Sequence, residues 1–496
     1  MNDPRRRAEH RALALSVLVP GMNGTTVPTW LRTAIADGLA GVLLFAPNTP
    51  DLETTRALSA ELHAAGPVLV MADEESGDVS RLQAAGGSSL AGAAALGAAD
   101  DVELTRESGR MLGRLQRAVG IDMDLAPVLD VASEPHNPVI GVRSFGPSAE
   151  VVSRHGAAMV QGLAEGGVLT CGKHFPGHGD TLVDSHLSLP TLDIPVDTLR
   201  ERDLPPFAAA AAAGMDSVMT GHLLIPALGS RPGTLEPAVT ALVRELPGGE
   251  DLAIITDALD MGAVSAAGLG EVCIQALEAG ADLLCLGHTM GRDDEAQFEL
   301  AVAGIVQALD AGRLSPEQLA EPQRRIARLR ERAAAHREQA PREDLQEIVT
   351  ELEQLGARAA RAAVIARGAV QRTGQPVLLD VRRRVNQAAG RFTRSFELAV
   401  QSRDEQALIG PDLDLAELPE GAAVMVVCRA PVTDAEEGER LRAVLAARPD
   451  AVVIHTGTRD SAPAHDALVL TSGAGRANAE AAIALILDGP REEGAA

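Results

Sequence analysis

The chain has 496 residues, enough for two or three domains, and 46% of them are hydrophobic, so a large core can be buried and extensive disorder is excluded. Its 69 acidic and 44 basic residues give a net charge of −25, which disfavours nucleic acid and anionic membrane surfaces as partners because like charges repel. Aromatic residues make up only 2%, so a ligand site must rely on charged and amide hydrogen bonds more than on stacking.

Along the first part of the chain, short apolar runs alternate with longer segments of helical spacing. Runs that are apolar almost throughout are typical of parallel strands buried on both faces. The eight predicted strands are Leu13–Val19, Val42–Phe45, Val68–Asp73, Ile121–Ala126, Val168–His174, Ser217–Gly221, Ala253–Asp257 and Asp282–Gly287. Eight strand–helix alternations favour an α/β fold of the TIM type, a (β/α)8 barrel. A doubly wound open sheet gives similar local patterns and is the alternative.

The character of the sequence changes after Ser315. Residues 315–370 are rich in Arg, Glu and Ala with helical periodicity, which predicts the last barrel helix and a connector. Further strands are predicted at Pro376–Val381, Phe396–Val400, Ala422–Cys428, Ala451–Thr456 and Ala467–Ser472. We therefore expect a barrel domain at 1–335, a helical connector at 336–371 and a smaller, sandwich-like α/β domain at 372–490.

The four cysteines lie far apart and form no C-x-x-C pair, which predicts free thiols in a reducing compartment. No apolar run approaches the ~20 residues needed to span a bilayer. Arg5–Arg7 precede the apolar run Ala12–Pro20 as in a signal peptide, but no small-x-small cleavage pattern follows. We therefore expect a cytoplasmic protein.

The densest group of reactive side chains lies at 171–190, just past the fifth predicted strand, where a barrel places its active site. It contains Lys173, the only lysine of the chain, which indicates that a compact ammonium is needed there. Asp184 stands two residues before His186, so its carboxylate can orient the imidazole and leave the other ring nitrogen free to exchange a proton. Alone, this pattern also fits a turn cap.

Polar side chains also follow other predicted strands. Asp257 ends an apolar strand, where a carboxylate is partly desolvated at the barrel mouth or caps the next helix. Asp73 ends another strand and Arg81 can return toward it, while a loop presents Arg143; both arginines also fit plain loop salt bridges. His222 follows the sixth strand, where a structural role is favoured if it is considered alone.

Together and in this order, the motifs resemble glycoside hydrolase family 3, in its β-N-acetylglucosaminidase branch. The matching segments are ADEESGDVSRL (72–82), DLAPVLDV (124–131), NPVIGVRSFG (137–146), GKHFPGHGDTLVDSHLSLP (172–190), VMTGH (218–222) and IITDALDMGAV (254–264). The resemblance covers about residues 10–335. It implies a (β/α)8-type catalytic barrel, a carbohydrate substrate, and neither a cofactor nor a metal.

The resemblance also implies roles for single residues. Asp257 is the expected nucleophile, and His186 with its partner Asp184 is the expected acid/base. The expected sugar-binding residues are Asp73, Arg81, Arg143, Lys173 and His174, to which we add His222. The sequence departs from the family where D-Q-E-G-G-R is replaced by residues 73–78, DEESGD, where Ala258 follows the nucleophile, and where VMTAH is replaced by VMTGH.

The expected function is retaining exo-hydrolysis of terminal β-linked N-acetylglucosamine from cell-wall fragments or short chitin oligomers. A β-N-acetylglucosaminide phosphorylase, a β-glucosidase and a non-catalytic sugar-binding protein are alternatives. From another class, His174, His178, Asp180 and His186 are candidate ligands of a metal-dependent barrel hydrolase. For the second domain we expect a structural or dimerisation role, with no nucleic-acid or membrane partner.

Overall fold

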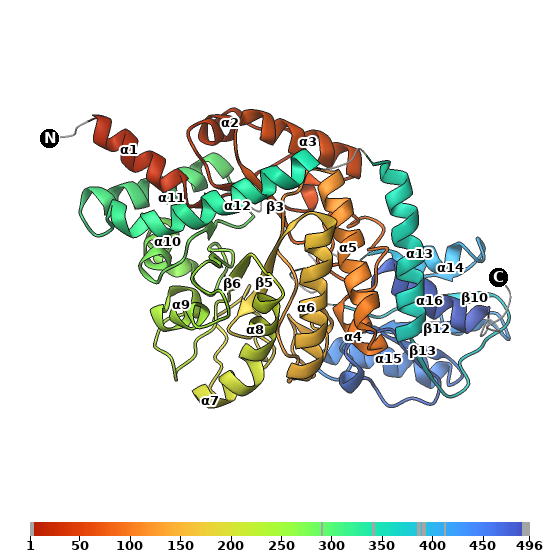
Figure 1. Cartoon of the computed structure of the whole chain (residues 1–496). Helices are drawn as coiled ribbons and strands as arrows, with labels where there is room; N and C mark the ends of the chain where they lie inside the picture. The colour runs from red at the N-terminus through yellow and green to blue at the C-terminus, as the bar shows by residue number, and fades with distance from the viewer. Residues whose placement is uncertain are drawn as a thin grey trace.

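The computed structural model describes residues 4–288, 291–339, 343–383, 388, 393–410 and 413–488. Figure 1 shows an N-terminal barrel domain and a C-terminal domain beside it, with helix α13 (Leu345–Ala363) running along their junction. The expected end of the second domain at residue 490 lies outside the described residues.

Eight parallel strands form the barrel. They are β1 (Leu18–Val19), β2 (Gly41–Leu44), β3 (Leu69–Ala72), β4 (Met123–Asp124), β5 (Leu169–Phe175), β6 (Ser217–Thr220), β7 (Ala253–Thr256) and β8 (Leu284–Cys285). Strands β2 to β7 pair in sequence order and β1 pairs with β8. Backbone hydrogen bonds from Leu283 N–H to Ile254 O and from Leu43 N–H to Pro20 O join the two groups and close the barrel. The prediction of a (β/α)8 fold is confirmed.

The first predicted strand was wrong over most of its length. Residues Leu13 to Leu15 end helix α1 (Pro4–Leu15), and only Leu18 and Val19 form β1. His10, Ala14 and Leu15 lie on the buried side of α1, which packs against α11 (Asp294–Asp310). The apolar run that begins at Leu13 therefore includes the buried end of a helix. Over so few residues, the spacing of apolar side chains does not distinguish such a helix end from a strand.

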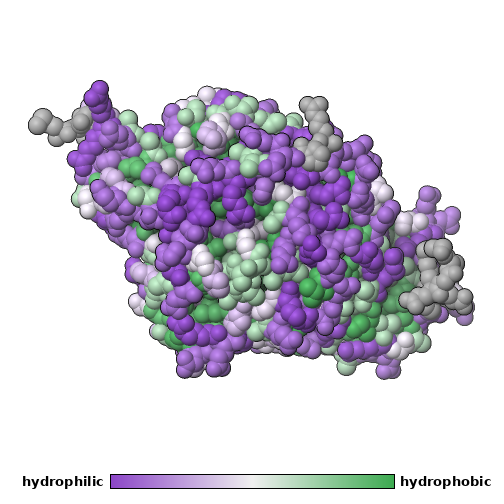
Figure 2. All heavy atoms as spheres, viewed as in Figure 1, coloured by the Kyte–Doolittle hydropathy of each residue, from purple (hydrophilic) through white to green (hydrophobic). Residues whose placement is uncertain are grey.

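Helices cover the outside of the barrel, and further helices belong to the C-terminal domain. Helices α1, α11 and α13 have been described above. The others are α2 (Thr29–Ala36), α3 (Leu52–Ala65), α4 (Ala93–Ala99), α5 (Val102–Ala118), α6 (Ala149–Gly166), α7 (Val196–Thr198), α8 (Leu204–Ala212), α9 (Pro237–Arg244), α10 (Leu269–Glu278), α12 (Ala320–Gln339), α14 (Ser395–Gln401), α15 (Ala435–Ala447) and α16 (Arg476–Leu487). The face seen in Figure 2 is mostly hydrophilic, as expected of amphipathic helices whose apolar sides face the strands.

Helix α12 closes the amino-terminal end of the barrel through charge pairs. Three of its arginines contact buried aspartates that precede alternate strands: Arg325 with Asp282, Arg332 with Asp216, and Arg337 with Asp122. Each aspartate also accepts a backbone N–H from the preceding strand, from Ile254, Thr170 and Val70 respectively. Each aspartate is thus bound both by a strand of the barrel and by an arginine of α12. These contacts hold α12 against the amino-terminal ends of the strands.

We expect Arg325→Leu to lower the free energy of unfolding by about 2–3 kcal/mol, because it leaves the buried Asp282 carboxylate with Arg244 as its remaining cation. Urea denaturation measures the change. The matched control is Arg324→Leu on the same helix: its side chain is 44% exposed and its pairs with Asp251 and Glu321 are surface pairs, worth at most about 1 kcal/mol. Equal losses in the two variants would contradict this role of Arg325.

The C-terminal domain has a six-stranded sheet in the order β11-β10-β12-β13-β14-β9. Its strands are β9 (Ile365–Arg367), β10 (Pro376–Asp380), β11 (Leu408–Ile409), β12 (Ala423–Cys428), β13 (Val452–His455) and β14 (Leu468–Leu470), all parallel except β9. Helices α14 and α16 cover one face and α15 the other. This is the predicted α/β sandwich.

Two details of this domain differ from the sequence predictions. Residues Phe396–Val400, predicted as a strand, lie in helix α14, where Phe396, Ala399 and Val400 form its buried side. The helical spacing of these three residues was obscured by the shortness of the run. The connector also contains β9, an antiparallel edge strand.

None of the described helices combines the length and apolar character needed to span a bilayer.

Candidate active site

The sequence-predicted site residues gather at the carboxyl ends of the barrel strands. Asp73 follows β3, Lys173 and His174 lie in β5, His222 follows β6 and Asp257 follows β7. Arg81, Arg143 and the loop with Asp184 and His186 reach the same end of the barrel. Parallel strands bring their carboxyl ends to one rim, which explains why side chains so far apart in sequence meet.

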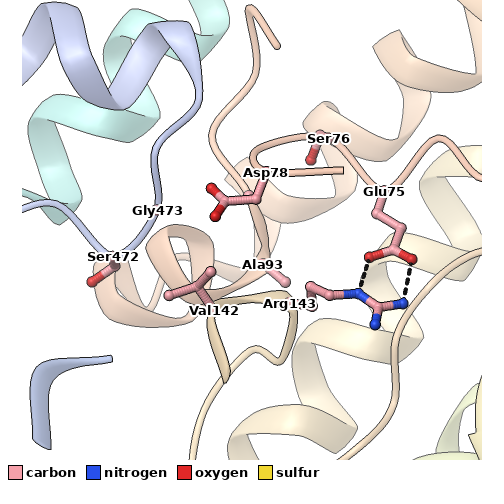
Figure 3. Close-up of a pocket in the computed structure, with 9 residues that line it drawn as sticks. Glu75, Ser76, Asp78, Ala93, Val142, Arg143, Ser472 and Gly473 are labelled. Atoms are coloured by element: carbon pink, nitrogen blue, oxygen red, sulfur yellow. Dashed lines mark hydrogen bonds and ion pairs between the residues drawn. The ribbon is translucent and has the colours of Figure 1, made fainter. Parts of the chain in front are cut away.

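Lys173 is the centre of a buried ionic cluster. Its side chain is 2% exposed, and its Nζ lies 2.7 Å from both Asp73 Oδ1 and Glu75 Oε1. Figure 3 shows the other side of Glu75, whose two oxygens accept from Nε and Nη2 of Arg143, each at 2.8 Å. Arg81 Nη2 lies 3.4 Å from Asp73 Oδ2. A single lysine ammonium thus bridges two carboxylates, each of which also binds an arginine.

These contacts fix the charges of the cluster. Burial disfavours a charged Glu75, but Arg143 and Lys173 outweigh it and lower the pKa of Glu75. Burial likewise disfavours a charged Lys173, yet Asp73 and Glu75 raise its pKa. The cluster therefore stays ionised at neutral pH and presents fixed donors to a polar ligand.

His174 is oriented by a buried carboxylate. Its Nδ1 donates to Asp130 Oδ2 at 2.7 Å, so Nε2 is left to face the site, 3.4 Å from Arg143 Nη2. The other oxygen of Asp130 accepts the backbone N–H of His178 at 2.7 Å. Asp130 thus sets the tautomer of His174 and holds the start of the next loop.

Asp257 has the environment of an ionised carboxylate. Burial would raise its pKa, but the imidazoles of His222, His174 and His186 and the backbone N–H of Ala258 lower it to about 2. That N–H donates to Asp257 Oδ1 at 2.8 Å. At neutral pH the group is therefore an anion, as a carboxylate nucleophile must be.

His186 lies on the loop that follows β5, close enough to Asp257 for its imidazole to lower the pKa of that carboxyl. Its Nδ1 is 2.7 Å from Asp184 Oδ1, an oxygen that also accepts the backbone N–H of His186 at 2.9 Å. The imidazole is 30% exposed while Asp184 is 9% exposed. Gly262, in the segment after Asp257, donates its N–H to His186 O at 3.3 Å. The loop of His186 therefore packs on the loop that follows the nucleophile candidate.

His222 differs from the other predicted sugar-binding residues. Its side chain is fully buried, with Nδ1 2.9 Å from Thr234 Oγ1 and Nε2 donating to Ala258 O at 2.9 Å. Both nitrogens are used by protein partners next to Asp257, which favours a supporting role over direct contact with a ligand.

The candidate metal ligands do not converge on one point, although the rings of His174 and His178 are neighbours. His174 pairs with Asp130, His178 with Thr181 and Ser185, Asp180 with Arg202, and His186 with Asp184. Within the described ranges, no group of three histidine, cysteine, aspartate or glutamate side chains is arranged to hold a metal ion. The geometry gives the metal-hydrolase alternative no ligand set there.

Two carboxylates that hold the cluster together, Glu75 and Asp130, were not predicted from the sequence. One signal for them was present: a barrel that buries its only lysine together with an arginine needs matching anions at neighbouring strand ends. Which of the acidic residues at 73–78 and 122–130 supplies them is a matter of side-chain direction, and only the structure decides it.

The C-terminal domain contacts the loop that carries Glu75. Ala474 donates its backbone N–H to Asp78 Oδ1 at 2.6 Å, and Figure 3 shows Asp78 turned toward the loop of Ser472 and Gly473. Arg81 Nη1 also donates to Ala388 O at 2.9 Å. The second domain thus lies against the outer wall of the ionic cluster, and Asp78, one of the departures from the family motif, is a contact residue.

Comparisons with known proteins show to which family the chain belongs. Residues 30–329 match the family model described as the Glycosyl hydrolase family 3 N terminal domain. A Beta-hexosaminidase A of Pseudoalteromonas piscicida is 34% identical over 336 residues, which cover 62% of this chain and 56% of that protein. A Beta-hexosaminidase of Chromobacterium violaceum is 38% identical over 256 residues, covering 50% of this chain and 71% of the other.

Among solved structures, a glycoside hydrolase family 3 beta-N-acetylglucosaminidase from Paenibacillus sp. str. FPU-7 matches with a TM-score of 0.84 at 29% identity, covering 98% of both chains. Its coverage extends over both domains, whereas the family model covers the barrel. The resemblance inferred from the motifs is confirmed, and this chain belongs to glycosyl hydrolase family 3, in the branch that contains the β-hexosaminidases.

Proposed function

We propose that the chain is a retaining exo-β-N-acetylglucosaminidase. The observation that carries the proposal is an ionised, partly buried Asp257 together with the Asp184–His186 dyad, whose loop contacts the segment that follows Asp257. The names of the relatives support the sugar: two are β-hexosaminidases and the full-length structural match is a β-N-acetylglucosaminidase.

In the first step Asp257 attacks the anomeric carbon and forms a glycosyl ester. The bond from that carbon to the glycosidic oxygen breaks, and His186 gives its Nε2 proton to the departing oxygen. Asp184 keeps its hydrogen bond to Nδ1 throughout, which holds the ring in place and stabilises its charged form.

In the second step the neutral His186 takes a proton from water. The water oxygen attacks the anomeric carbon, the ester to Asp257 breaks, and the sugar leaves with its original anomeric configuration. Two inversions at the same carbon give net retention.

The ionic cluster is the proposed sugar clamp. Lys173, Arg143, Arg81, Asp73 and His174 provide donors and acceptors for the hydroxyl and N-acetyl groups, and their mutual contacts fix their positions before the substrate binds. We propose that His222 positions the backbone next to Asp257 through its hydrogen bond to Ala258 O. No aromatic platform is required, in keeping with the composition.

The first test compares nitrophenyl N-acetylglucosaminide with nitrophenyl glucoside, each with and without inorganic phosphate. We expect the N-acetyl substrate to have a kcat/KM higher by about 10²-fold or more, since a site built to bind an amide rejects a sugar that lacks it. We expect free N-acetylglucosamine as the product and no dependence on phosphate.

A phosphorylase is the second candidate, because a histidine at the acid/base position does not repel phosphate as a carboxylate would. A sugar 1-phosphate product, formed only with phosphate, would replace the hydrolase proposal by this one. Preference for the glucoside would instead indicate a β-glucosidase. Activity that survives chelation would argue against the metal-hydrolase alternative.

For the natural substrate we propose terminal N-acetylglucosamine on cell-wall fragments, with short chitin oligomers next. The cytoplasm is the proposed compartment, supported by four buried, unpaired cysteines. The proposed domains are the catalytic barrel at 1–335, the connector at 336–371 and the C-terminal domain from 372. Homodimer formation stays a prediction, which light scattering of the purified protein tests.

A further inference from the structure

The loop at 176–190 carries the proposed acid/base and has little apolar anchoring. Leu182, Val183 and Leu187 are 69%, 40% and 70% exposed, so they contribute little burial energy. Position must therefore come from polar contacts. In the first part of the loop, Asp180 Oδ2 accepts from Arg202 Nη1 at 2.7 Å, and the buried His178 contacts Ser185, the residue before His186.

We propose that His178 and Ser185 form a latch that positions His186 for proton transfer. His178 is 1% exposed and Ser185 is 2% exposed, and 3.0 Å separates His178 Nε2 from Ser185 Oγ. Ser185 lies between Asp184 and His186, so the contact fixes the backbone of the dyad itself. The inference rests on the proposed role of His186 as the acid.

The other contacts of His178 bind it to its own loop and to the segment that follows β4. Its Nδ1 lies 2.9 Å from Thr181 Oγ1, and Asn137 Nδ2 donates to its carbonyl oxygen at 2.9 Å. Its backbone N–H donates to Asp130 Oδ1, while Asp130 Oδ2 binds His174. A continuous set of hydrogen bonds therefore runs from the sugar clamp through Asp130 and His178 to the acid/base loop.

The imidazole of His178 is suited to a fixed contact. Burial lowers its pKa to about 4, so it is neutral at neutral pH, with one nitrogen that donates and one that accepts. Both of its partners are hydroxyls, which can take either role. The ring thus needs no counter-charge, in contrast to His186, which changes charge during the reaction.

The latch predicts a selective kinetic defect. Loss of the contact shifts His186 away from the departing oxygen but leaves Asp257 and the sugar clamp in place. Leaving groups that depart without a proton should then react almost normally, and poor leaving groups should react slowly. General-acid assistance is worth about 10²–10⁴-fold, so partial misplacement should cost about 10–100-fold.

The experiment measures kcat/KM of Ser185→Ala on a series of aryl N-acetylglucosaminides with increasingly poor leaving groups, ending at chitobiose. We expect less than about threefold loss for the best leaving group and about 10–100-fold for chitobiose. His178→Asn should give the same steepened dependence, and the double variant should be little worse than either single variant because both remove one contact.

The matched control is Ser188→Ala, which removes an exposed hydroxyl from the same loop and should behave as wild type. Equal loss on all substrates, or no loss on any, in Ser185→Ala would overturn the latch. His186→Ala separates this result from the proposed function. If that variant lacks the steepened dependence, the acid assignment fails; if it shows the dependence and Ser185→Ala does not, the latch alone fails.

Discussion

Replacing Asp257 by Asn is expected to lower kcat by at least about 10⁴-fold on every glycoside, because the amide cannot form the glycosyl ester. The change is isosteric and the site keeps its donors, so N-acetylglucosamine should still raise the melting temperature of the variant. Steady-state assays with both aryl and oligosaccharide substrates measure the loss.

The control for this variant is Asp260→Asn, three residues further along the same loop. Asp260 pairs with Arg292 Nη2 at 2.8 Å, and burial raises its pKa to about 6. It shares the local charge and backbone of Asp257 but lies in no proposed step, and we expect activity within about tenfold of wild type. Similar losses in the two variants would assign the effect to loop damage and not to a nucleophile.

Replacing His186 by Ala is expected to have the second-largest effect, and that effect should depend on the substrate. Chitobiose should lose about 10²–10⁴-fold in kcat/KM, since its departing oxygen needs a proton. Dinitrophenyl N-acetylglucosaminide should lose little, because its phenolate leaves unassisted. Stopped-flow and steady-state rates on the two substrates give the ratio.

Asp184→Asn is the companion to this variant. The amide cannot stabilise the imidazolium that forms, although it can still accept the backbone N–H of His186 that Asp184 Oδ1 now accepts. We expect a smaller loss of kcat/KM than in His186→Ala, with the same substrate dependence.

For His186→Ala itself, an equal loss of kcat/KM on both substrates would show that His186 is not the acid.

Much of this protein could be predicted from its sequence because the signals are local. Almost continuous apolar runs at regular intervals predicted the buried strands of a barrel, and the unusual Lys173 marked the site. Short runs without clear periodicity failed, as at Leu13–Leu15 and Phe396–Val400, which lie in helices. There the choice between helix and strand depends on which neighbour buries the apolar side.

The tertiary structure alone decided which charges meet. The sequence by itself determined the barrel, the family and the order of Asp73, Lys173, His186 and Asp257 along the chain. It could not determine that Glu75 holds Arg143 and Lys173, or that His178 contacts Ser185, because such contacts depend on side-chain directions at the rim. A buried charge is stable only beside its partner, and that pairing is set by the closed barrel.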